Sequence, residues 1–274
     1  MNFDDSPYSE ELEAARDAAR KAGKIIDRYR RGKIEVDGRK ASYSDIVTEA
    51  DLEVQEKIVE VIRDRFPGDA IKAEEQQLSE DHSDRVWVID PIDGTMNFFH
   101  GLDYFCTSIG LRIGKSGVLG VVHSPVTGLD ETFIGLEDHG AFRLEDINAE
   151  EGERLSVSTG EMKGELYTTY VRDGEPDKRE VQLETISRFS GREMVHRASG
   201  AAALDICRIA GGDMSLLADF LGEWDYAAGR TILEEAGGEI DVLGTATDQD
   251  MVVASSEEFH DEAVEIVEDS LERF

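Results

Sequence analysis

Cysteine is scarce in this chain, which has only 2 cysteines among its 274 residues. Both of them, Cys106 and Cys207, stand in apolar surroundings. Two cysteines exclude a disulfide-rich framework, so we interpret the pair as buried free thiols in a reducing compartment.

Positive charge is also scarce. The chain carries 29 basic residues against 61 acidic ones, which gives a formal net charge of -32. This balance excludes binding to nucleic acid or to an anionic membrane through bulk charge. Self-repulsion on this scale destabilises a compact fold unless salt screens it, so the composition predicts adaptation to a salt-rich cytoplasm. An acidic protein of ordinary salt requirement is the alternative.

Long apolar runs are missing as well. No stretch approaches the roughly 20 apolar residues that a helix needs to span a bilayer. The opening MNFDDSPYSE is acidic and lacks the apolar core of a signal peptide. We therefore expect a soluble cytoplasmic protein, and the 40% of hydrophobic residues are enough for one large domain or two smaller ones that share a core.

Apolar periodicity predicts an α+β organisation in the first half of the chain. Residues 9–31 repeat apolar side chains at three- and four-residue steps, as an amphipathic helix does. A second helix is expected over 48–65, where the turn FPGD ends it. Strands are expected at 70–73 and 85–90, before a β meander over 104–144 with a hairpin turn at GKSG.

The polar stretch 145–155 marks the expected boundary between two halves, residues 1–147 and 148–274. The second half alternates strands with helices, which is typical of an α/β arrangement. A serine, Ser255 or Ser256, is expected to cap the last helix. Strands are expected at 165–171, 213–220 and 251–255, and helices at 178–190, 201–211, 226–238 and 257–273.

The stretch WVIDPIDGTMNF begins as a buried strand and ends in residues that open a helix or a tight turn. The strand carries Asp90 to its end, where Pro91 lacks an N–H and breaks the ladder. Asp93 then stands beside Gly94 and Thr95, whose exposed N–H groups can hold an anion. Two carboxylates next to a phosphate site need a divalent cation between them, and hard oxygen ligands suit Mg²⁺. A simple PIDG β-turn is the alternative.

Three further acidic motifs each have a structural explanation beside a functional one. Glu74 and Glu75, in AEEQ, suit a solvated turn after a short strand. Asp51, in SDIVTEAD, stands at capping-box spacing from Thr48. Asp225, in GEWDYAAG, precedes a helix that it would cap. Each motif alone is ambiguous, but together they favour a shared site.

The four motifs DIVTEAD, AEEQ, WVIDPIDGTMNF and GEWDYAAG stand in the order and at the separations of one family. The chain resembles the inositol monophosphatase family, the lithium-sensitive, Mg²⁺-dependent sugar and inositol phosphatases, in its archaeal-type inositol monophosphatase/fructose-1,6-bisphosphatase form. The resemblance runs over roughly residues 10–272. It implies an α+β fold, a layered αβαβα sandwich with the site between its halves.

The resemblance also implies roles for individual residues. Two or three Mg²⁺ ions would be held by Glu74, Asp90, the backbone carbonyl of Ile92, Asp93 and Asp225. The catalytic residues would be Glu74, Thr95 and Asp51, which position and activate the attacking water. The substrate would contact Asp93, Gly94, Thr95, Gly200, Ala203, Asp219 and Asp225.

The chain departs from the family pattern at a few positions. Ala73 replaces the Gly that usually precedes the Glu pair, and Ala201 replaces a common Thr or Ser. The family's acidic contact to a sugar hydroxyl falls on Ala218, so Asp219 would substitute for it after a one-residue slip. Lys40 stands where the family often keeps a lysine near the metal-site loop. These departures leave the substrate open, but not the metal chemistry.

The resemblance implies an Mg²⁺-dependent phosphomonoesterase that hydrolyses inositol monophosphate, fructose 1,6-bisphosphate or both. It further implies a homodimer with small phosphorylated polyols or sugars as partners. The alternative substrate is 3′-phosphoadenosine 5′-phosphate. A catalytically silent dimeric scaffold, or a phosphate-binding protein without turnover, would be a different class of function, but neither fits a chain that keeps all the implied metal ligands.

The net charge of -32 generates a prediction about salt. We expect the chain to lose structure in dilute buffer and to recover it in about 1 M KCl, where the Debye length falls to about 3 Å and screens the repulsion. Circular dichroism measures both states. Full helical signal and an unchanged melting temperature at about 10 mM salt, where the Debye length is about 30 Å, would contradict the halophilic interpretation.

Overall fold

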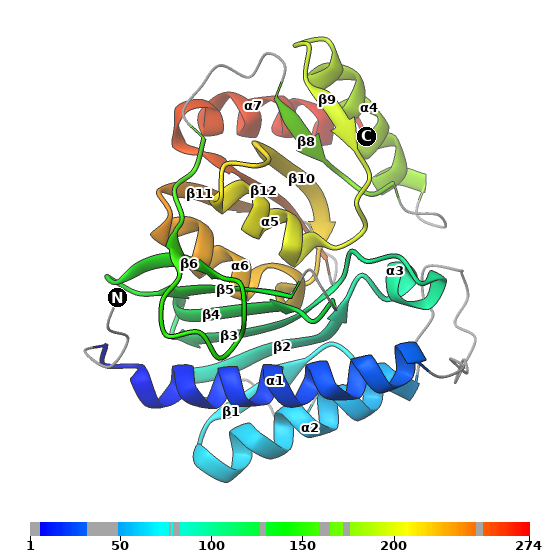
Figure 1. Cartoon of the computed structure of the whole chain (residues 1–274). Coiled ribbons are helices and arrows are strands. Elements are labelled where there is room, and N and C mark those ends of the chain that lie inside the picture. The colour runs from blue at the N-terminus through cyan, green and yellow to red at the C-terminus, as the bar shows by residue number, and fades with distance from the viewer. Residues whose placement is uncertain are drawn as a thin grey trace.

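The computed structural model describes residues 6–31, 49–76, 78, 83–126, 130–158, 165–171, 176–244 and 249–274 (Figure 1). Lys40 and Thr48 lie outside these residues. None of the described helices is long and apolar enough to cross a membrane.

Two long helices form the outermost layer on one side of the molecule (Figure 1). The first is α1 (Ser9–Arg31), as its periodicity predicts, and the second is α2 (Glu49–Arg65). The buried face of α1 is largely alanine, so α1 approaches its neighbours closely. Both helices contribute to one core cluster with the first sheet, around Trp87 and Ile109.

Within the described residues the first sheet has seven strands in chain order, with β1 parallel to β2 and every later neighbour antiparallel. The predicted hairpin at GKSG is confirmed, because β3 and β4 pair across it. The strands are β1 (Ala70–Ala73), β2 (Arg85–Asp93), β3 (Cys106–Ile113), β4 (Ser116–Ser124), β5 (Glu131–Leu136), β6 (Gly140–Leu144) and β7 (Glu153–Arg154).

The expected break of the ladder at Pro91 is confirmed, but the expected end of the strand at Asp90 is wrong. Strand β2 continues to Asp93, and its pairing with β3 shifts register between Asp90 and Asp93. A register shift absorbs the missing N–H of proline, because the irregular stretch has no regular ladder bond to lose. Helix α3 (Thr95–His100) follows directly.

The second sheet, as far as the structure describes it, has five strands in the order β11-β12-β10-β8-β9. Its short strand β9 and its hairpin strand β11 were absent from the sequence-based expectations. The strands are β8 (Leu166–Thr168), β9 (Val195–Arg197), β10 (Leu216–Leu221), β11 (Gly238–Leu243) and β12 (Asp250–Ser256).

Four helices complete the layers: α4 (Pro176–Ser190), α5 (Ala202–Ala210), α6 (Glu223–Glu235) and α7 (His260–Leu271). Helices α5 and α6 lie between the two sheets, and α4 and α7 cover the outer face of the second one (Figure 1). The layers therefore run helix, sheet, helix, sheet, helix, and the predicted α+β sandwich of αβαβα type is confirmed.

Several helix boundaries differ from the sequence-based ones, and the largest differences are in α6 and the final helix. Helix α6 starts at Glu223, so Asp225 lies inside its first turn instead of before it. The final helix starts at His260 after a 3-10 turn, Glu257–Phe259. Ser256 takes the N-cap position of that 3-10 turn without a side-chain capping bond.

The division into halves 1–147 and 148–274 remains a prediction. Two features link the halves closely: β7 extends the first sheet beyond residue 147, and the central core cluster joins Cys106 and Val122 to Leu204 and Ile232. Both cysteines are free and buried in that cluster, as predicted.

A row of glycines lets α6 lie unusually close to the first sheet. Gly110, Gly120 and Gly135 are cross-strand neighbours on β3, β4 and β5. A Cβ on Gly110 would lie 3.0 Å from the backbone nitrogen of Ala228, and one on Gly120 would overlap the carbonyl oxygen of the same residue. A Cβ on Gly135 would lie 2.6 Å from Cα of Ile232. The glycine row thus fixes where α6, and with it Asp225, meets the sheet.

Gly120→Ala tests this packing. We expect the added methyl group to push α6 off the sheet and to lower the free energy of unfolding by about 1–3 kcal/mol or more, as other overpacked cores do. Thermal unfolding measures the loss. Gly68→Ala is the matched control, because a Cβ on Gly68 meets nothing within 4 Å. Equal melting temperatures for the two variants would show that the close approach of α6 is not needed.

Candidate active site

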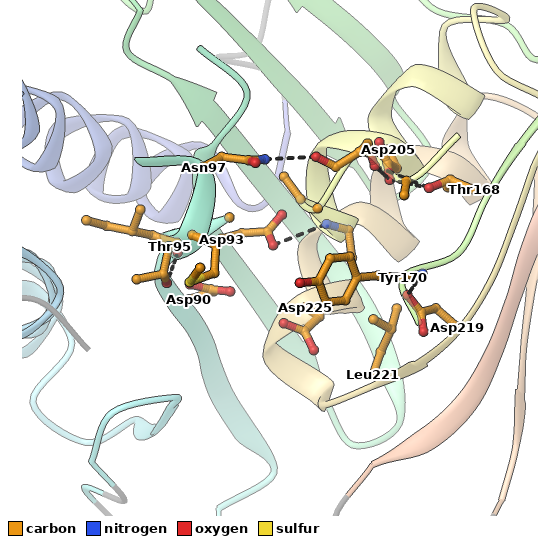
Figure 2. Close-up of a pocket in the computed structure, with 18 of the residues that line it drawn as sticks. Asp90, Asp93, Thr95, Asn97, Thr168, Tyr170, Asp205, Asp219, Leu221 and Asp225 are labelled. Carbon is orange, nitrogen blue, oxygen red and sulfur yellow. Dashed lines mark hydrogen bonds between the residues drawn. The ribbon is translucent and has the colours of Figure 1, made fainter. Parts of the chain in front are cut away.

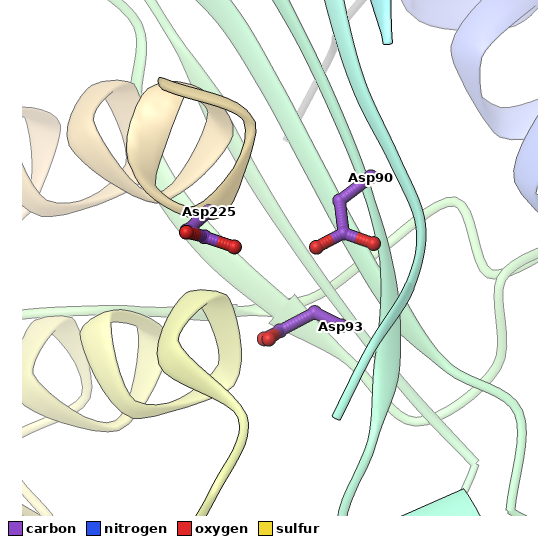
Figure 3. Close-up of side chains that lie close together, drawn as sticks. All are labelled: Asp90, Asp93 and Asp225. Carbon is purple, nitrogen blue, oxygen red and sulfur yellow. The ribbon is translucent and has the colours of Figure 1, made fainter. Parts of the chain in front are cut away.

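The end of β2 presents two carboxylates to a pocket between the sheets. Asp90 and Asp93 are 2% and 6% exposed, although aspartate is almost never buried without a partner. The register shift between them changes the alternation of the strand, and both side chains face the same space (Figure 3). The predicted placement of two acids at the end of a buried strand is thus confirmed. The strand continues through both of them with a shift of register.

Asp225 reaches the same space from the opposite layer, at the start of α6 (Figure 3). One of its oxygens, Oδ2, accepts the N–H of Gly222 at 2.7 Å, which fixes the side chain inside the first turn. Gly222 is the N-cap, so the interpretation of Asp225 as the cap is wrong. Ligand oxygens of Asp90, Asp93 and Asp225 all lie within 4.8 Å of one another.

Charged bridges anchor the start of α6 beside this cluster. Glu223 accepts from Lys72 of β1 at 2.7 Å and from Arg112 of β3 at 2.8 Å. The backbone carbonyl of Trp224 accepts the hydroxyl of Ser108 at 3.4 Å. These contacts tie the residues next to Asp225 to two strands of the first sheet.

The carboxylates raise one another's pKa values. Burial raises the pKa of Asp93 to about 8, and the charge of Asp225 adds to the rise. Burial also raises the pKa of Asp90 well above its usual value, with Glu74 as the largest charged contributor. Without a counter-charge the cluster therefore resists full ionisation at neutral pH.

Glu74 stands at the end of β1 and lines the same pocket. Glu74 as a whole residue is exposed to solvent. Desolvation of its carboxyl group raises the pKa of Glu74 well above its usual value, and the charge of Asp225 adds to the rise. Glu74 does not belong to the group of carboxylates whose ligand oxygens all lie within 4.8 Å of one another, which consists of Asp90, Asp93 and Asp225.

The donor set fits a hard divalent cation. One oxygen of Asp90, Oδ1, is buried and has no hydrogen-bond partner among the described residues. An unpartnered buried oxygen on a carboxylate that clusters with two further carboxylates is costly unless a cation neutralises the group. Oxygen ligands of this kind suit Mg²⁺.

The N-terminus of α5 stabilises the ionised form of Asp93 and so opposes part of the rise in its pKa. The N–H groups of Ala202 and Ala203 donate to Oδ1 and Oδ2 of Asp93 at 3.1 and 2.8 Å. The thiol of Cys106 lies 3.6 Å from Oδ2. Ala203 is thus placed behind Asp93, while Ala202 forms part of the pocket wall among the described residues.

Thr95 and Asp51 lie together, as the resemblance implies. The hydroxyl of Thr95 can donate to the carbonyl oxygen of Ile92 at 3.0 Å or to Oδ1 of Asp51 at 3.4 Å. Asp51 is fully buried in the first turn of α2, behind Thr95 as seen from the pocket. The described residues thus place a threonine hydroxyl between a buried carboxylate and the cavity.

Backbone contacts fix the loop around Gly94. Gly94 has φ 89°, and a Cβ there would lie 3.1 Å from Cβ of Ala201, so only glycine fits. The amide of Asn97 donates to the carbonyls of Tyr104 and Ser199 at 2.7 and 2.8 Å. The first turn of α3 is therefore docked against the 198–202 segment, with its N–H groups at the pocket.

These elements enclose a cavity of about 260 Å³ (Figure 2). Asp219 lines it, whereas the preceding Ala218 belongs to the outer core of the second sheet. The one-residue slip places the carboxylate on the cavity side, because successive residues of β10 face opposite ways. Among the residues implied by the family, Glu74, Asp90, Ile92, Asp93, Gly94, Thr95, Gly200, Asp219 and Asp225 line this cavity.

Some pocket residues escaped the sequence-based expectations. Asp205 accepts the hydroxyls of Tyr104 at 2.6 Å and of Thr168 at 3.0 Å, and also that of Ser199. Burial raises the pKa of Asp205 to about 6, while these donors oppose the rise. The position of Asp205 among apolar residues of the helix expected at 201–211 was the signal that could have identified it. Tyr170, two residues after the short strand β8, gave no such signal.

Comparison with known proteins shows which family the chain resembles. The model of the inositol monophosphatase family matches residues 8–272. An inositol monophosphatase of Mesembryanthemum crystallinum is 35% identical over 246 residues, 85% of this chain and 86% of that protein. The fructose-1,6-bisphosphatase/inositol-1-monophosphatase of Thermotoga maritima is 35% identical over 248 residues, 88% of this chain and 90% of that protein.

The solved structure of the Thermotoga maritima IMPase is similar in fold, with a TM-score of 0.81 and 32% identity. The match covers 96% of this chain and 99% of the other. The motifs, the layered fold and the acidic pocket agree with these matches, and the chain belongs to the inositol monophosphatase family.

Proposed function

We propose that this family phosphatase is an Mg²⁺-dependent phosphomonoesterase that hydrolyses inositol monophosphate, fructose 1,6-bisphosphate or both. The observation that carries the proposal is the cluster of Asp90, Asp93 and Asp225, drawn from two layers into one pocket with an unpartnered carboxylate oxygen. Phosphate-ester hydrolysis needs positioning and charge neutralisation more than covalent chemistry, and an acidic pocket can supply both only through bound cations.

Asp90, Asp93, Asp225, Glu74 and the carbonyl of Ile92 would hold two or three Mg²⁺ ions. When bound, Mg²⁺ would neutralise charge on the phosphate oxygens and lower the pKa of the attacking water. The remaining contributions come from the protein itself.

Thr95, Asp51 and Glu74 would prepare the water. When the Thr95 hydroxyl donates to Asp51, its lone pairs are left to accept a hydrogen bond from a water in the pocket, and a proton taken from that water would be balanced by transfer of the hydroxyl proton to Asp51. Burial and the neighbouring carboxylates raise the pKa of Glu74 well above its usual value, which makes this carboxylate a stronger proton acceptor than an ordinary glutamate. How the proton transfer divides between Glu74 and the Thr95–Asp51 pair is open to test by single and double substitution.

The substrate's phosphate would rest on the first turn of α3. The N–H groups of Gly94 and Thr95 have no acceptor within that helix, so they are available to phosphate oxygens. Gly200 and Asp219, on the far side of the cavity, would then meet the alcohol part of the substrate.

The choice of substrate is supported by the Thermotoga maritima relative, whose name joins both activities. The alternative is 3′-phosphoadenosine 5′-phosphate. A catalytically silent scaffold is less well supported, because a protein without a metal-dependent function has no need to hold three mutually repelling carboxylates in one cluster. We further propose a cytoplasmic homodimer, as the resemblance implies.

Asp93→Asn tests the assignment. Phosphate release in about 1 M KCl, with and without Mg²⁺, should fall by roughly 10²-fold or more in kcat, because the variant loses a charge that must be present in the transition state. Asp261→Asn, an exposed aspartate on α7, is the matched control and should retain activity. Circular dichroism checks that both variants fold.

The substrates to compare are myo-inositol 1-phosphate, fructose 1,6-bisphosphate and 3′-phosphoadenosine 5′-phosphate. Mg²⁺-dependent release from either of the first two supports the proposal. Release from the nucleotide alone would keep the mechanism and replace the substrate. Near-normal activity of Asp93→Asn would show that the metal assignment is wrong.

A further inference from the structure

Tyr170 presents its ring to the cavity opposite the carboxylates. It follows β8, and its side chain lines the pocket while 38% of the residue remains exposed. In Figure 2 the ring extends from the backbone toward the side of the pocket where Asp93 and Asp225 lie. An exposed aromatic ring inside a polar pocket can bind a ligand that has an apolar face.

Hydrogen bonds fix the backbone of Tyr170 on both sides. Its N–H donates to Oδ2 of Asp219 at 2.8 Å, and its carbonyl accepts from the amide of Gln182 at 2.7 Å. The same amide nitrogen donates to Oδ1 of Asp219 at 2.6 Å. Gln182 is fully buried on α4, so one amide positions both the ring and the carboxylate.

The wall beside Tyr170 alternates apolar and acidic groups. Leu217, Asp219 and Leu221 line the cavity from alternate positions of β10, so one carboxylate stands between two aliphatic side chains. A ligand that suits this wall has hydroxyl groups on its edge and C–H groups on its face. A phosphorylated ring polyol or sugar has both.

The cavity is small. Its volume of about 260 Å³ lies below the roughly 300–1,000 Å³ of pockets that hold drug-sized ligands. The phosphate and its metal ions would share this space with the alcohol part, which favours a compact alcohol such as a single ring.

We infer that Tyr170 is a specificity-determining residue, which packs on the C–H face of a one-ring phosphorylated polyol or sugar, and that Gln182 is a positioning residue for Tyr170 and Asp219. This inference rests on the proposed function of the same pocket. It predicts that the protein discriminates ring substrates from small acyclic phosphates through Tyr170.

Binding calorimetry tests the role of Tyr170, with Ca²⁺ in place of Mg²⁺ to suppress turnover. The quantity is the ratio of the affinities for myo-inositol 1-phosphate and glycerol 2-phosphate. Tyr170→Ala should lower this ratio about 10-fold, because the variant loses the apolar contact between the tyrosine ring and one face of the ligand ring. Tyr170→Phe keeps the ring and should retain the ratio.

Gln182→Met tests the positioning role, since it keeps the volume and removes both hydrogen bonds. It should lower the same ratio and, in the Mg²⁺ assay, raise KM for the ring substrate more than it lowers kcat, because the contact serves ground state and transition state alike. Leu183→Ala, at the neighbouring and 45% exposed position, is the control for damage to α4.

An unchanged ratio in Tyr170→Ala would overturn the inference, and so would tighter binding of 3′-phosphoadenosine 5′-phosphate than of the ring polyol. For Gln182→Met, a fall in kcat with unchanged KM would indicate a general structural role. Failure of the proposed function is a separate result, because it shows as absent Mg²⁺-dependent phosphate release by the unaltered protein, while the binding ratio can still be measured.

Discussion

Electrostatic repulsion within the acidic pocket is the constraint on which the rest of the structure depends. Ligand oxygens of Asp90, Asp93 and Asp225 lie within 4.8 Å of one another, where both aspartates of β2 are buried and Asp225 is half-buried. Because the folded-state pKa of Asp93 is raised to about 8, the metal-free folded state holds a proton that the unfolded state has released. This group therefore lowers stability progressively as pH rises from about 4 to about 8. A bound divalent cation would reverse that cost.

The fold opposes this repulsion with rigid contacts on each side. The glycine row of β3, β4 and β5 lets α6 lie against the sheet, and Glu223 ties its first turn to Lys72 and Arg112. The N-terminus of α5 donates two N–H groups to Asp93. Two layers of the sandwich, the first sheet and the central helices, thus meet at one cluster, and the same central helices bring the substrate wall of β10 to it.

The motifs and most elements could be predicted from the sequence because they rest on local patterns. Asp90 follows an apolar strand, and the helix 9–31 has a clear period. What could not be predicted depends on tertiary contacts. Strand β2 passes Pro91 because a register shift removes the need for its N–H, and β9 forms only by pairing with β8. Tyr170 and Gln182 meet only because α4 packs on the second sheet.

The most direct measurement is the melting temperature of the unaltered protein and of Asp90→Asn, with and without MgCl₂, at about pH 9 and constant ionic strength in KCl. We predict that saturating Mg²⁺ raises the melting temperature of the unaltered protein by roughly 5–10 °C. Without Mg²⁺, Asp90→Asn should melt at a higher temperature than the unaltered protein and gain less from the ion, because one repelling charge is gone. A melting temperature that Mg²⁺ leaves unchanged, together with a less stable Asp90→Asn, would contradict the assignment of this pocket as a divalent cation site.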